Sequence, residues 1–244
     1  MKMLRGLAGS CAFGVSLLAF AAAPMARAQD GASASPSRPS AAVSFAFERP
    51  GVAVPKFILR IGEDGTGSYK GEEAPPLSPY PGVSSPTEPI DRGLALSSPT
   101  AHKIFMLARS LHYFNVACAS KAKNIADTGK KTLFYKGPDG EGSCTYNYSE
   151  NKSVNQLTEI FQGIASTMDE GRRLDHLHRY DRLGLDAAIG QLTQEIADGH
   201  ALELGTIQTT LRSIADDTAV IERVRTRANS LLALVPVEMR QAGP

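Results

Sequence analysis

Residues 56–69 read KFILRIGEDGTGSY, and this stretch contains both a strand pattern and a turn. Phe57, Leu59 and Ile61 recur at every second position, which is typical of a strand that buries one face. The glycines of Glu63–Gly67 tolerate positive φ, so this segment predicts a hairpin turn, with Tyr69 on the returning strand. The stretch therefore predicts an antiparallel sheet.

A second segment repeats this turn chemistry between strand patterns at 131–135 and 143–148. Gly137–Cys144 matches Gly62–Tyr69 at Gly, Asp, Gly, Gly and Ser, and the preceding strands both begin with lysine, Lys56 and Lys131. One hypothesis is an internal repeat of two hairpin-plus-helix units. The other is that two turns converged on the same chemistry. Both hypotheses predict a sheet with helices packed on one face.

The remaining patterns predict further strands and several helices. Alternation predicts strands at 43–47 and 90–96, and apolar stripes predict a helix from Ser98-Pro99 to Phe114 and a long one over 154–168. Further helical stripes cover 185–196, 204–214 and 220–231. We therefore expect an α+β fold, with a small antiparallel sheet, helices on one face and a C-terminal helical bundle. The expected organisation is an α+β domain at 42–180, a Pro-rich surface loop within it at 72–89, and a helical region at 181–240 packed on the domain.

Residues 1–28 have the pattern of a secretory signal peptide. Lys2 and Arg5 precede an apolar run that ends in an A-x-A site, which predicts cleavage between Ala28 and Gln29. The apolar run is too short for a transmembrane span, which needs about 20 residues. Lipidation at Cys11 is disfavoured because most of the apolar run follows it. We expect a disordered lead-in at 29–41 and a periplasmic or extracellular protein without a transmembrane segment.

Charge and cysteine content agree with export. Three of the 26 basic residues belong to the leader, and 25 acidic residues remain, so the mature chain has a net charge of −2. Such a balanced chain lacks the basic footprint of a nucleic-acid-binding protein. The mature chain keeps two cysteines, Cys118 and Cys144, and an even pair in an oxidising compartment predicts a disulfide that ties the segment after the first helix to the sheet.

The common catalytic motifs are missing. The glycine-rich turns lack the Lys-Ser/Thr pair of a phosphate loop, and the sequence has no H-E-x-x-H and no short Cys/His spacing. The weak catalytic candidates are Asp175, His176, His178 and Asp181, although His176 and His178 would lie about 200° apart around a helix. No metal and no cofactor is expected. Asn147 and Asn151 are formal glycosylation sequons.

Three functions remain open. The leading hypothesis is a non-catalytic binding or protein-interaction protein with an unknown protein or envelope partner, and the Pro-rich loop would present a recognition surface. One alternative is a metal-dependent or acid–base hydrolase that uses the Asp175–Asp181 segment, which requires those side chains to converge in a pocket. The other is a structural component of the envelope.

From Ser98 onward the chain resembles a family of exported bacterial proteins that has no assigned activity. The matching segments include Asn124–Gly129, Ser149–Lys152, Phe161–Ile164, Asp181–Asp186 and Ile214–Asp217. The resemblance implies a bacterial host, and hence a periplasmic or secreted protein whose sequons are not glycosylated. It implies no functional residue.

Overall fold

The structure is a computed structural model that describes residues 40–74 and 86–241. All described residues belong to one compact unit, which lies within Arg38–Pro244. The predicted signal peptide, its cleavage site and most of the predicted lead-in lie outside the described residues.

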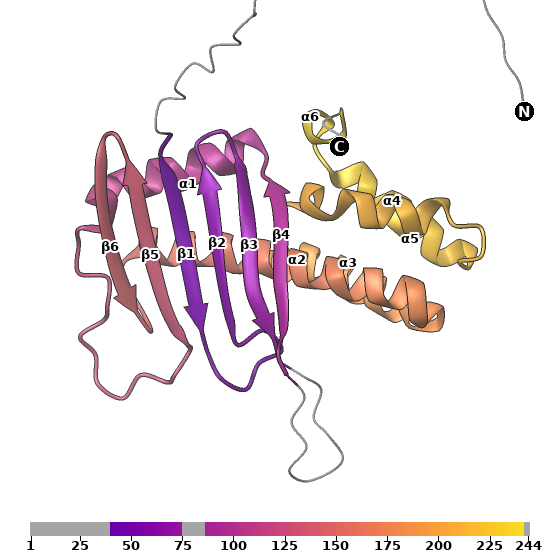
Figure 1. Cartoon of the computed structure of the whole chain (residues 1–244), viewed down its shortest axis with the longest axis horizontal. Helices are drawn as coiled ribbons and strands as arrows, with labels where there is room; N and C mark the ends of the chain where they lie inside the picture. The colour runs from indigo at the N-terminus through magenta and orange to yellow at the C-terminus, as the bar shows by residue number, and fades with distance from the viewer. Residues whose placement is uncertain (1–39, 75–85, 242–244) are drawn as a thin grey trace, which may run out of the picture. The chain divides into compact units, whose positions relative to one another are not determined.

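One antiparallel sheet of six strands forms the first half of the described chain (Figure 1). The strand order is β4-β3-β2-β1-β5-β6, so the central strand β1 pairs with β2 on one side and β5 on the other. The strands are β1 (Ala42–Glu48), β2 (Lys56–Gly62), β3 (Thr66–Glu73), β4 (Glu88–Ala95), β5 (Lys130–Gly137) and β6 (Gly140–Tyr146).

Helices follow the strands and complete the predicted α+β fold, which is confirmed. Helices α1 (Ser98–Ser110) and α2 (Lys152–Tyr180) lie behind the sheet in the view of Figure 1. The C-terminal helices pack together beyond the β4 edge of the sheet. They are α3 (Leu185–Ala197), α4 (Gln208–Asp216), α5 (Glu222–Leu234) and the short α6 (Val237–Gln241), with 3₁₀ turns η1 (His112–Phe114), η2 (Arg182–Gly184) and η3 (Leu204–Ile207) between elements.

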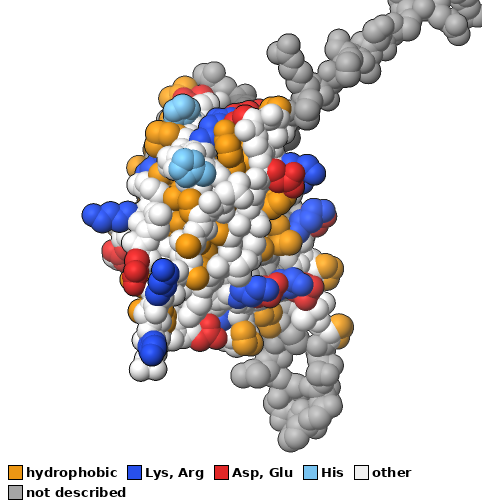
Figure 2. All heavy atoms as spheres, turned by 90° about the vertical axis from the view of Figure 1, so that its left-hand side faces the viewer, with side chains coloured by type: hydrophobic (Ala, Val, Ile, Leu, Met, Phe, Trp, Pro, Cys, Tyr) orange, Lys and Arg blue, Asp and Glu red, His pale blue; other side chains and the backbone are white. Residues whose placement is uncertain are grey.

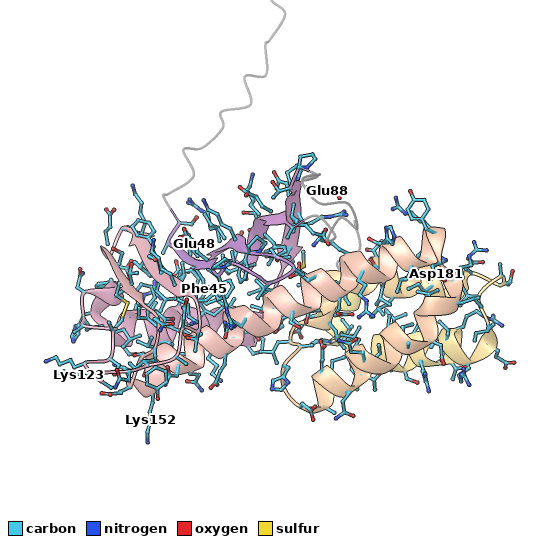
Figure 3. All side chains as sticks on the ribbon, turned by 90° about the horizontal axis from the view of Figure 1, so that it is seen from below. Phe45, Glu48, Glu88, Lys123, Lys152 and Asp181 are labelled. Atoms are coloured by element: carbon cyan, nitrogen blue, oxygen red, sulfur yellow. A yellow bond between two sulfur atoms is a disulfide. The ribbon has the colours of Figure 1, made fainter. Side chains whose placement is uncertain are left out.

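Alternation along the strands produces the first hydrophobic core. Phe45, Leu59 and Leu133 occupy one row across β1, β2 and β5, and all three are fully buried. The ring of Phe45 stacks on Phe161 of α2 with 5.2 Å between centroids, and Figure 3 shows Phe45 between the sheet and this helix. Burial of these large apolar side chains fixes α2 on the covered face of the sheet.

A second core lies among the C-terminal helices and begins inside α2, at Leu174. The apolar faces of α3, α4 and α5 close around the end of α2, as their periodicity predicts. Helix α2 therefore contributes to both cores, so the helical region continues the sheet domain through a shared element.

The two glycine-rich turns are not structural equivalents. Val43 of β1 pairs with Ile61 of β2 on one side and with Tyr135 of β5 on the other. In the sequence match, however, the counterpart of Ile61 is Lys136 rather than Tyr135. Gly65 has a φ of +81°, and its counterpart Gly140 does not have positive φ. The matched lysines also differ, because Lys131 is buried and Lys56 is exposed. These differences favour convergent turn chemistry over an internal repeat.

Gly140 and Gly142 serve a close approach between η1 and β6. Residues 112–114 all have positive φ, an uncommon left-handed turn for non-glycine residues. A Cβ on Gly140 would lie 2.5 Å from the Tyr113 ring, and a Cβ on Gly142 would lie 2.3 Å from the Tyr113 carbonyl oxygen. The glycines therefore make room for the turn.

The strands extend into the predicted Pro-rich loop. Glu72 of β3 pairs with Pro89 of β4, and Glu73 pairs with Glu88, so the structure corrects the expectation that prolines exclude regular structure throughout 72–89. Pro89 is tolerated because β4 is an edge strand, where a missing N–H need not break a ladder. Residues 75–85 of this loop lie outside the described residues.

Two further features qualify the expectations from sequence. Ala41 falls within the predicted lead-in, yet it is fully buried and its carbonyl oxygen accepts a hydrogen bond from Glu63 N. Tyr148 lies beyond β6 and is exposed, because that strand ends at Tyr146.

Among the described residues, no helix is long and apolar enough to cross a membrane.

Candidate functional site

A polar pocket of about 420 Å³ lies where the first three turns of α2 meet the start of β5 and the end of β6. This volume falls within the range of small-molecule sites. Hydroxyl, amide and charged side chains dominate its lining, which consists of Arg49, Thr128, Lys131, Tyr146, Asn147, Tyr148, Ser149, Asn155, Thr158, Glu159 and Gln162.

Lys131 is the most unusual lining residue, because it points to the covered face of the sheet and is only 5% exposed. Its ammonium donates to four oxygens, namely Thr128 O at 3.0 Å, Thr128 Oγ1 at 2.9 Å, Gly129 O at 3.1 Å and Asn147 O at 2.9 Å. Burial lowers the pKa of Lys131, and the charge of Asp127 opposes that effect. The ammonium therefore joins the segment before β5 to the end of β6.

Asn147 holds the same segment from the other side. Its Oδ1 accepts from Thr128 N at 2.8 Å and from Thr128 Oγ1 at 2.9 Å, while its Nδ2 donates to Ala126 O at 2.9 Å. A glycan on Nδ2 would disrupt this last bond, so the fold disfavours use of this sequon. Thr128, the one lining residue of the 118–129 segment, is thus held in a fixed position at the pocket and forms one wall together with Lys131 and Asn147.

The predicted disulfide closes that wall. Cys118 and Cys144 are bonded, with 5.9 Å between their Cα atoms. The bond ties the segment after η1 to β6, and Ser120 N donates to Tyr148 O farther along the same segment. A disulfide is typical of a protein that works in an oxidising compartment.

The start of α2 forms the opposite wall. The Asn151 side chain caps the helix by accepting from Ser153 N at 2.9 Å, and Asn155 Nδ2 donates to Ser149 O at 3.0 Å. Tyr146 and Thr158 share a hydrogen bond of 2.5 Å between their hydroxyls, and burial raises the pKa of Tyr146 to about 12. Both walls are therefore positioned before any ligand arrives.

Four lining side chains remain available to a ligand. Within residues 40–74 and 86–241, the side chains of Arg49, Tyr148, Glu159 and Gln162 make no hydrogen bond or ion pair. All four are exposed at the pocket. Fixed walls combined with free polar groups are the usual arrangement of a preorganised binding site.

A second hollow of about 350 Å³ lies at the opposite ends of these strands, over α1. Its Arg109 bonds to Glu63 of one hairpin turn and, at 2.8 Å, to Asp139 of the other. The phenol of Tyr135 donates to Asp139 at 2.6 Å. Because its main charged groups already satisfy one another, this hollow has the chemistry of a structural clamp.

A half-buried acid lies between the sheet and the middle of α2. Tyr69 donates to Asp169 at 2.8 Å, and Arg172 bonds to both Asp169, at 3.2 Å, and Glu73. Burial raises the pKa of Asp169 to about 7, although the Tyr69 hydrogen bond opposes the shift. This cluster connects β3 to α2 outside the two hollows.

The four residues singled out from sequence do not converge. The His176 ring packs on Tyr180, with 4.9 Å between centroids, while His178 bonds to Asp217 at 2.8 Å. Asp181 Oδ1 accepts from Gly184 N at 3.3 Å, and Asp175 is half-buried on α2. In the described part of the chain, no group of three or more His, Cys, Asp or Glu side chains could hold a metal ion. Figure 3 places Asp181 at the far end of α2 from Lys152, and hence far from the polar pocket.

Charges on the side of the molecule shown in Figure 2 are mixed, with basic and acidic side chains interspersed. That side therefore has no extended field of one sign.

Sequence reasoning missed the polar pocket. The alternation rule could have revealed one signal, because it puts Lys131 at a strand position that faces the core. In the sheet, Lys131 lies between its pairing partners Phe47 and Tyr146. The contribution of Arg49 depends on the fold, because β1 brings it against Gly129.

The chain matches no protein-family model and no curated protein.

Proposed function

We propose that this is an exported, non-catalytic binding protein that takes a small polar ligand in the pocket above Lys131. The observation that carries the proposal is the pairing of two fixed walls with four free polar side chains, which are Arg49, Tyr148, Glu159 and Gln162. Binding energy in such a site comes from hydrogen bonds that replace those to water without further ordering of the walls.

The leader pattern and the disulfide support export to the periplasm or the medium. The resemblance from Ser98 onward supports membership of a family of exported bacterial proteins. The sequence alone directed attention to the Pro-rich loop as the recognition surface, but residues 75–85 lie outside the described residues. The pocket is therefore the better supported site.

Chemical-shift mapping tests the proposal. Mature protein, residues 29–244, would be labelled with ¹⁵N and titrated with small sugars, amino acids and capped dipeptides. We expect at least one compound to shift the signals of Asn147, Asn155 and Gln162 in a saturable way.

A matched pair of variants separates pocket binding from surface binding. Gln162→Trp places a large ring in the pocket from an exposed helix position, and Gln194→Trp makes the same change on α3. Loss of the shifts in the first variant alone supports the proposal. Shifts that persist in Gln162→Trp, or no response to any compound, would refute it.

A further inference from the structure

We infer that the ligand of this pocket is a small monoanion, a carboxylate with a polar body; this inference rests on the proposed function. Two cations, Arg49 and Lys131, line the pocket, and Glu159 is the one lining carboxylate. The lining side chains therefore carry one positive charge in excess.

Neither cation makes an ion pair, although the charge of Asp127 acts on Lys131 and opposes the lowering of its pKa by burial. Lys131 is surrounded by uncharged oxygens, and no described acid lies within ion-pair distance of its ammonium or of the Arg49 guanidinium. Carbonyl oxygens replace the hydration of a buried ammonium but do not balance its charge. Asp127 supplies part of that balance. An anion in the adjacent pocket would add to it, and it would also balance Arg49.

Arg49 lies close enough to act together with Lys131. Gly129, whose carbonyl accepts from Lys131, leaves no room for a side chain because Phe47 and the Cβ of Arg49 lie against it. The charge of Arg49 also lowers the pKa of Lys131, as expected for two cations facing one space. Because Lys131 has no free donor, Arg49 supplies the hydrogen bonds and Lys131 supplies only charge.

The adjacent segment favours the same sign. Residues 119–129 carry Lys121 and Lys123 against Asp127. Figure 3 shows Lys123 and Lys152 at the same end of the molecule. A positive surround increases the local concentration of anions and speeds their association.

The charge balance and the lining narrow the ligand class. One excess positive charge matches a carboxylate better than a phosphate monoester, which carries about −1.5 to −2 at pH 7. A planar guanidinium also suits bidentate binding of a carboxylate. The free amide of Gln162 and the free hydroxyl of Tyr148 suit hydroxyls or amides on the ligand body, as in a sugar acid or a peptide carboxylate.

Matched acid and neutral probes test the inference by isothermal titration calorimetry on the mature protein at low salt. The pairs are glucuronate with glucose, and N-acetylalanine with its amide, which distinguish a sugar source from a peptide source. Inorganic phosphate is the third arm. We expect the acid of at least one pair to bind about tenfold or more tightly than its neutral partner, as an ionic hydrogen bond implies.

Arg49→Gln should reduce that ratio to about one, since Arg49 is exposed and its loss leaves the walls intact. Arg60→Gln, an exposed arginine on the other face of the sheet, should keep the ratio. Equal binding of acid and neutral probes would overturn the inference and leave the proposed function standing, as would tighter binding of phosphate. Failure of every probe to bind would overturn both.

Discussion

At the scale of single residues, Asp169 shows how burial changes the chemistry of one carboxyl group. It lies between β3 and α2, accepts from Tyr69, and has a pKa raised by burial to about 7 from an ordinary 3.8. The folded protein therefore holds a proton between about pH 4 and pH 7 that the unfolded chain has released.

This difference predicts a pH-dependent stability. The free energy of unfolding should fall as the pH rises through that window, and the loss should level off above pH 7. Because the side chain is partly exposed and Arg172 is adjacent, we expect a change of about 1–2 kcal/mol. Urea unfolding of Asp169→Asn at pH 5 and pH 8 should show a weaker pH dependence than the parent. Asp91→Asn, an exposed site on β4, is the control; an unchanged slope in Asp169→Asn would contradict the account.

Gly142 illustrates a residue whose role depends on packing rather than on turn chemistry. Gly142→Ala would place a Cβ 2.3 Å from the Tyr113 carbonyl oxygen, so it should lower the free energy of unfolding by about 2–3 kcal/mol. Gly93→Ala is the matched control, since a Cβ there meets nothing within 4 Å. Chemical denaturation measures both, and equal stability of the two variants would show that η1 does not need the glycine.

At the scale of elements, the disulfide anchors a wall of the pocket. Its loop closes over a sequence separation of 26 residues, which corresponds to about 3 kcal/mol in the chain-entropy model. Replacing both cysteines by serine should cost stability of that order and increase hydrogen exchange in residues 119–129. The double replacement should also weaken the binding of any ligand in the pocket, because Thr128 and the oxygens that accept from Lys131 belong to this wall. Unchanged exchange in this segment would separate the disulfide from the site.

The elements themselves could largely be read from periodicity. In residues 56–61 the alternating apolar side chains are buried, and in the last third the apolar stripes of the helices face the second core, as the patterns predict. The pairing of β1 with both β2 and β5 could not be read in this way, since it is long-range and independent of local pattern. The same limit concealed the site, because Arg49, Lys131 and Gln162 come from three separate parts of the chain.

The turns show where local reading misleads. The similar segments Gly62–Ser68 and Gly137–Ser143 form one turn with a left-handed glycine and one without. In the second turn, the glycine at 140 is needed instead for the close approach of Tyr113. The Pro-rich segment misled in the opposite direction, since Pro89 sits within an edge strand.

At the scale of the whole molecule, one carboxylate joins the two cores. Glu203, in the connection between α3 and α4, accepts from Ser97 N at 2.7 Å, from Ser97 Oγ at 2.7 Å and from Thr100 Oγ1. It caps the start of α1, which has no side-chain cap of its own at Ser97. The helical region is thereby tied to the sheet half at a second point besides α2.

Glu203→Ala should therefore destabilise the protein by about 2–3 kcal/mol, the range for a lost cap and a charged hydrogen bond. We also expect the C-terminal helices to unfold at lower denaturant than the sheet, which would show as separate transitions by far-ultraviolet and tyrosine signals. Glu141→Ala, at an exposed position of β6, is the control. A single transition with unchanged midpoint would contradict the role assigned to Glu203.

Native mass spectrometry of the protein purified from its own host tests the central claim, that the pocket binds a small polar ligand, most directly. The account predicts an added mass of one small molecule on the parent chain and on Gln194→Trp, and its absence from Gln162→Trp. A bare chain in all three, or an added mass that Gln162→Trp retains, would contradict it.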